Sequence, residues 1–85
     1  MKKLHLTLHK KWFDEIKSGI KKEEYRDLKP YWITRLFDKD GTPKKLDVIE
    51  FRNGYNKNAP KMIIEFLGLK KGMDKITIKL GEILK

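Results

Sequence analysis

The chain contains no cysteine. Disulfide cross-links, thiolate metal sites and a thiol nucleophile are therefore excluded as sources of stability or chemistry. Stability has to come from packing and hydrogen bonding alone. A chain of 85 residues supports one modest core, and we expect a single domain over residues 1–85.

Long hydrophobic runs are absent as well. No apolar stretch approaches the ~20 residues that a membrane span requires. Residues 1–6 are basic, but polar side chains interrupt them before a signal-peptide core can form. These absences lead us to expect a cytoplasmic protein that makes no membrane contact.

Positive charge, by contrast, is in excess. Lysine and arginine number 21 against 12 aspartate and glutamate residues, which gives a formal net charge of +9. Such a field attracts polyanions, RNA among them, through counterion release. A lysine-rich surface that only keeps the protein soluble has the same composition. Charge alone therefore favours a nucleic-acid partner without establishing one.

Hydrophobic periodicity predicts five strands and two helices. Leu4, Leu6 and Leu8 alternate with polar residues, as a half-buried strand requires. Trp12, Phe13 and Ile16 are spaced as one helical face requires. The predicted elements are strands at 4–8, 21–27, 47–52, 61–67 and 75–84, with helices at 10–18 and from Pro30 onward. This order predicts an α+β fold, a small five-stranded β-barrel or strongly bent sheet with two short helices.

The segment at residues 19–26 carries the densest polar chemistry. Gly19 ends the first predicted helix, and Lys21, Glu24 and Arg26 follow within a strand whose expected core anchor is Tyr25. On a regular strand Lys21 points away from the other two charges, so they converge only if the chain turns at 20–22. A converged cluster could hold a phosphate or a base edge. A solvated strand with ion pairs of ~0–1 kcal/mol each is the open alternative.

A second candidate follows the third predicted strand. Arg52, Asn53 and Tyr55 come together around Gly54, and aromatic rings stack on unpaired bases while Arg and Asn supply hydrogen bonds. Alternatively, Asn53-Gly54 is a hairpin turn and Tyr55 covers the end of the barrel.

Other chemistry finds little support in the sequence. His5 and His9 lie on a strand with no third ligand nearby, so no metal site is expected. The sequence shows no phosphate-binding glycine loop and no Ser/His/Asp arrangement. We expect no cofactor.

Taken together, these pieces resemble the ASCH family, a branch of the PUA-like superfamily. Its hallmark G-x-K-x-x-E-x-R is matched by Gly19, Lys21, Glu24 and Arg26, and the flanking segments 4–18, 31–32, 47–55 and 79–83 are similar to the family over nearly the whole chain. The resemblance implies a PUA-like barrel with a cleft beside the first helix. It further implies RNA or nucleotide binding, in RNA metabolism or translation, with cleft residues Lys21, Glu24, Arg26, Arg52, Asn53 and Tyr55.

The resemblance also implies an alternative function as a small hydrolase. Some members deacetylate acetylated cytidine, with the motif lysine acting beside a threonine, and ribonuclease activity has been attributed to others. Glu24 stands at the position of that threonine, so the threonine mechanism does not transfer. Lys21 as a base, or Glu24 activating water with Glu65 or Glu82 as a second carboxylate, keeps the question of catalysis open.

Overall fold

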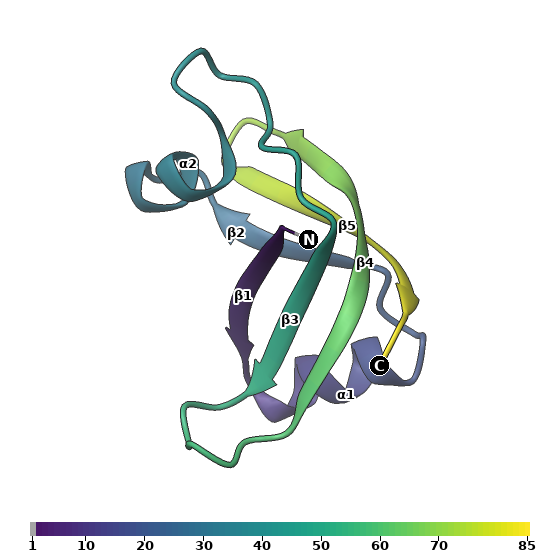
Figure 1. Cartoon of the computed structure of the whole chain (residues 1–85). Helices are drawn as coiled ribbons and strands as arrows, with labels where there is room; N and C mark the ends of the chain where they lie inside the picture. Colours follow the sequence, from purple (N-terminus) through teal and green to yellow (C-terminus); the bar gives the residue numbers. More distant parts are fainter. Residues whose placement is uncertain (1) are drawn as a thin grey trace.

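The computed structural model describes residues 2–85, which form a small α+β domain (Figure 1). Its seven elements follow the predicted order. They are β1 (Lys3–Leu8), α1 (Lys10–Lys17), β2 (Glu23–Asp27), α2 (Pro30–Leu36), β3 (Val48–Asn53), β4 (Lys61–Lys71) and β5 (Lys75–Ile83). The predicted succession of strands and helices is therefore confirmed.

All five strands belong to one mixed sheet in the order β1-β3-β4-β5-β2. β1 and β3 are parallel, and the other neighbouring pairs are antiparallel. A parallel pair needs a long crossover connection, and here α1, β2 and α2 supply it. In this strand order β1 and β2, which are close in sequence, form the two opposite edges of the sheet.

The sheet curls into a half-barrel because its longest strands bend. The pairing of β4 with β5 shifts register on both sides of Phe66, and Gly68 has a φ of +137° that suits glycine. The curl brings the two edge strands toward each other. The Arg26 guanidinium, on β2, donates a hydrogen bond to the Thr7 carbonyl, on β1, at 3.4 Å. We call this open junction between β1 and β2 the seam.

The core fills the concave side of the sheet. α1 lies at the end of the sheet where β1 and β3 finish, and α2 lies near the end of β2 (Figure 1). Both helices pack apolar residues inward. The buried core consists of Leu4, Leu6, Leu8, Phe13, Ile16, Leu36, Phe37, Ile49, Phe51, Met62, Ile64, Ile76, Ile78 and Leu80.

One prediction about the second strand is wrong. Tyr25 does not anchor the core, since 43% of it is exposed, whereas its neighbour Glu24 points inward and is 5% exposed. The strand also begins later than predicted, at Glu23 instead of Lys21. Trp12 likewise departs from the buried helical face, being 38% exposed beside the buried Phe13. All of these departures occur around the seam.

Candidate functional site

A pocket of about 710 Å³ lies at the seam. Consecutive residues of both edge strands line it, 5–9 around the end of β1 and 24–26 on β2, which places it across the facing edges of the sheet. We call it the seam pocket. Its lining residues are His5, Leu6, Thr7, Leu8, His9, Trp12, Lys21, Glu24, Tyr25, Arg26, Tyr31, Trp32 and Tyr55.

Glu24 is the central polar group of this pocket. It is the one buried charged residue in the part of the chain that the structure describes. A buried carboxylate is costly unless charged or hydrogen-bonding groups compensate it. Its Oε1 accepts a hydrogen bond from the Tyr25 N–H at 2.8 Å and lies 3.6 Å from the Lys21 ammonium. Its Oε2 lies 3.3 Å from Nη1 of Arg26.

The two motif cations, Lys21 and Arg26, therefore converge on the carboxylate of Glu24, and the local backbone explains how. Gly19 takes a φ of +85° after α1, and the Lys21 N–H then donates to the Glu15 carbonyl at 3.1 Å. Lys21 lies before the start of β2, so the alternation of side chains along that strand does not apply to it. The chain turns at 18–20 and stays irregular at 21–22, so Lys21 is outside the regular strand, which is the condition that convergence required.

Arg26 joins the two edges of the half-barrel. Its Nη1 donates to the Tyr25 carbonyl at 2.7 Å, and its Nη2 donates to the Thr7 carbonyl across the seam. The guanidinium also lies 5.2 Å from the centre of the Trp32 ring. Arg26 is thus held by a carboxylate, two carbonyls and an aromatic face.

Aromatic side chains make up much of the remaining wall. The Lys21 ammonium lies 4.7 Å from the centre of the Trp12 ring and 5.0 Å from that of Tyr25. Tyr31 and Trp32 meet edge to face at 4.8 Å. Sequence reasoning assigned Trp12 to the core and missed its place in this pocket. The available signal was its ring nitrogen, which favours a site with access to water.

The second group of predicted site residues, Arg52, Asn53 and Tyr55, does not lie together in this pocket. Tyr55 lines the seam pocket, but Arg52 and Asn53 do not. Arg52 is half-buried and its Nη2 donates to the Asn56 carbonyl at 2.8 Å, which ties down the β3–β4 loop. Asn53 lines a smaller neighbouring pocket of about 260 Å³, and Tyr55 lines both this pocket and the seam pocket.

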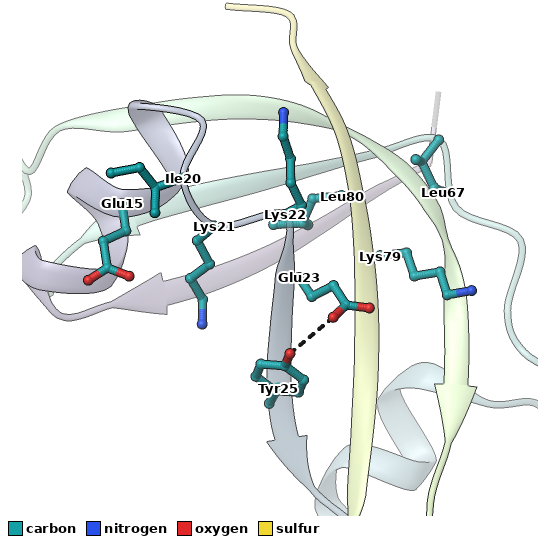
Figure 2. A pocket seen from close by; sticks show the side chains of 9 residues that line it. All are labelled: Glu15, Ile20, Lys21, Lys22, Glu23, Tyr25, Leu67, Lys79 and Leu80. Atoms are coloured by element: carbon teal, nitrogen blue, oxygen red, sulfur yellow. Dashed lines mark hydrogen bonds between the residues drawn. The ribbon is translucent and has the colours of Figure 1, made fainter.

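A further pocket of about 590 Å³, which we call the outer pocket, is lined by residues of α1, β2, β4 and β5 and of the segment between α1 and β2 (Figure 2). The two share Lys21 and Tyr25. In the outer pocket the Tyr25 hydroxyl donates to the Glu23 carboxylate at 3.0 Å. That hydrogen bond, reinforced by the negative charge of the carboxylate, raises the pKa of Tyr25. The carboxylates of Glu15 and Glu23 offset two of the three lysines that line this pocket, Lys21, Lys22 and Lys79.

The histidine of β1 pairs with a carboxylate on the neighbouring strand β3. His5 Nδ1 lies 3.1 Å from Glu50 Oε2, in a pair that Lys3 joins at 3.5 Å from Oε1. Within residues 2–85, no group of three or more His, Cys, Asp or Glu side chains is placed to hold a metal ion. In the same range, no helix has the length and apolar character needed to cross a membrane.

The seam pocket combines two cations held by one buried carboxylate, several aromatic faces and an open strand edge. This arrangement can hold an anionic, planar ligand. Comparison of the chain with protein-family models, with curated proteins and with solved structures finds no match. Its function is therefore inferred from its own residues.

Proposed function

We propose that this chain is an ASCH-type, PUA-like domain that binds RNA in the seam pocket. The observation that carries the proposal is the convergence of Lys21 and Arg26 on the buried Glu24 inside a pocket of about 710 Å³. Convergence of these three charges is what the motif requires of a ligand-binding cleft. A net charge of +9 adds long-range attraction for a polyanion. On this proposal the domain acts in RNA metabolism or translation in the cytoplasm.

The cations are the direct ligands for phosphate on this proposal. Lys21 and Arg26 keep only 15% and 17% of their side chains exposed, so their positions are well restricted before any ligand arrives. Preorganised donors lose less conformational entropy on binding than flexible surface lysines do. Glu24 orients both cations, and Tyr55 contributes at the rim.

Binding fits this geometry better than the hydrolase alternative. Both oxygens of Glu24 are engaged by the Tyr25 N–H and by two cations, which leaves the carboxylate poorly placed to activate a water. Glu24 is also the one carboxylate among the described residues that line the pocket, and Glu65 and Glu82 lie elsewhere. A pair of carboxylates for acid and base chemistry is therefore not assembled at the seam.

RNA binding measured over a salt series tests the proposal. Single-stranded RNA binds the wild type with a steep salt dependence, and each lost phosphate contact lowers the slope of log K against log salt by about one. Lys21→Met and Arg26→Gln each weaken binding and flatten that slope. Lys70→Met removes the same charge from an exposed position on β4 and serves as the matched control.

The outcome is decided on folded proteins, so each variant is first melted and binding is measured well below its transition. If both seam variants bound RNA as the wild type does, the site assignment would be wrong. Turnover of acetylated cytidine or of labelled RNA, lost in Lys21→Met and Glu24→Gln, would favour the hydrolase alternative instead.

A further inference from the structure

The aromatic residues of this chain are sorted by type. The sequence holds two tryptophans, three tyrosines and four phenylalanines. Both tryptophans and all three tyrosines line the seam pocket: Trp12, Trp32, Tyr25, Tyr31 and Tyr55. The phenylalanines lie elsewhere, buried in the core or, for Phe66, partly buried against it. The aromatic rings that carry an N–H or O–H group therefore line one pocket, whereas the purely apolar rings pack in or against the core.

Core packing does not explain where the tyrosines lie. Tyr55 is 90% exposed and Tyr31 is 57% exposed, so neither ring is placed by burial. The Arg35 guanidinium already lies over the Tyr31 ring, 4.5 Å from the centre of that ring. The Tyr55 ring has no cation or aromatic partner among residues 2–85. It therefore presents free π-faces at the rim of the pocket, ready to stack on another flat ring.

The edge of β1 supplies hydrogen-bonding groups beside these rings. The Leu8 carbonyl faces β3, where it accepts from the Gly54 N–H at 3.1 Å. Along a strand, the N–H and C=O of one residue point to one side and those of the next residue to the other, so the N–H and C=O groups of His5 and Thr7 face the seam. The contact from Arg26 to the Thr7 carbonyl agrees with this direction. A planar ligand in the pocket would meet an N–H donor and C=O acceptors at its edge.

Charge selects among planar ligands. Lys21 and Arg26 outweigh Glu24 by one positive charge in the seam pocket, which disfavours amines and favours a ring attached to an anion. We infer that the seam pocket receives one unpaired nucleobase, stacked against Tyr55 with its edge toward the open edge of β1. This inference rests on the proposed RNA binding and names the part of the RNA that enters the pocket.

An unpaired base suits the pocket in size as well as in chemistry. A volume of about 710 Å³ falls within the range of pockets that enclose small ligands. A base within a duplex cannot stack on a protein ring, because its own neighbours cover both faces. The RNA has to be single-stranded, or to carry a loop or bulge, at the bound position.

Two probes of equal charge test the inference. One is a short uridine oligonucleotide, and the other is an abasic ribose-phosphate chain of the same length. Because both tryptophans of the chain line the pocket, their fluorescence reports its occupation. We expect the uridine oligonucleotide to change tryptophan emission and to bind about tenfold more tightly than the abasic chain, since base stacking is worth about that factor.

Tyr55 provides the matching variants. Its side chain is almost fully exposed, so Tyr55→Ala leaves the fold intact and should reduce the uridine affinity about tenfold without changing that of the abasic chain. Tyr55→Phe should bind as the wild type does, and Met73→Ala, at an exposed side chain of the β4–β5 turn, is the control. Equal affinity for the two probes would overturn the inference while leaving RNA binding in place. If neither probe bound, the proposed function itself would be overturned.

Discussion

Replacing Lys21 by methionine preserves most of the side-chain length and removes the ammonium group. In the wild type that ammonium lies 3.6 Å from a Glu24 oxygen, and the Glu24 side chain is only 6% exposed. The variant would leave the buried carboxylate with Arg26 as its single cationic partner, so Lys21→Met should lower the stability of the whole fold in addition to weakening binding.

The size of this effect follows from the contacts of Glu24. At 3.6 Å and an effective dielectric constant of about 20, the gross Coulomb attraction is about 4–5 kcal/mol. Removing one partner of a buried pair costs about 3–5 kcal/mol when the remaining charge has no other partner. Glu24 retains Arg26 at 3.3 Å and the Tyr25 N–H at 2.8 Å, so we expect about 1–2 kcal/mol. In a domain of this size that lowers Tm by roughly 5–15 °C.

Thermal unfolding followed by circular dichroism at neutral pH measures the loss. The control Lys70→Met, at an exposed position on β4, should change stability by less than about 0.5 kcal/mol. Adding Glu24→Gln to Lys21→Met removes the under-compensated charge and should restore part of the lost stability. The reasoning fails if Lys21→Met melts like the wild type, because Glu24 would then not depend on the ammonium.

Two other predictions concern positions near the site and in the sheet. Glu23→Gln should lower the pKa of Tyr25 toward 10.0, because the hydrogen bond to the Glu23 carboxylate and then its charge hold that pKa up. Ultraviolet titration of tyrosinate measures the change, and unchanged titration would contradict it. Gly81→Ala should cost about 1–3 kcal/mol by overpacking, since the new Cβ would overlap Oε1 of Glu65 and lie 2.9 Å from its Cβ. Thermal unfolding should show partial recovery in Gly81→Ala with Glu65→Ala, and an undiminished Tm in Gly81→Ala would count against the close packing.

The strands and helices followed from local patterns in the sequence. Leu4, Leu6 and Leu8 alternate and are all buried, as their period of two predicts. Gly19 adopts the left-handed conformation that its place after a helix predicts. These features depend on residues close in sequence, where steric and hydrophobic preferences act directly.

The inward direction of Glu24 could not be predicted in the same way. Hydrophobicity favours Tyr25 as the buried residue of that strand, and the opposite arrangement holds because two cations reach the carboxylate. One of them, Lys21, does so from outside the strand. Its reach depends on the turn after α1, a tertiary feature that strand alternation does not describe.

Which residues line the seam pocket depends on the order of the strands in the sheet, which the sequence did not predict. Trp12, Tyr31 and Tyr55 come from α1, α2 and the β3–β4 loop, and they meet only because β1 and β2 are the two edges of one curled sheet. The sequence predicted a small barrel or a strongly bent sheet without deciding between them, and a closed barrel would leave no open edge at which these residues could meet. The sheet is a half-barrel, and the seam pocket lies at its open edge.

From the hydrophobic pattern of the sheet, an apolar residue would be expected at position 24. Inward positions on the neighbouring β5, such as Ile76 and Ile78, are apolar, and well-packed apolar residues often equal or exceed a buried ion cluster in stability. The position instead holds a charge that lies 3.6 Å from the Lys21 ammonium and 3.3 Å from the Arg26 guanidinium in the seam pocket, which both tryptophans line. Burying a carboxylate costs desolvation free energy. That cost is understandable if the two cations that the carboxylate orients bind a ligand. On the proposed function that ligand is the phosphate next to a stacked base, and Glu24 is a positioning residue for it.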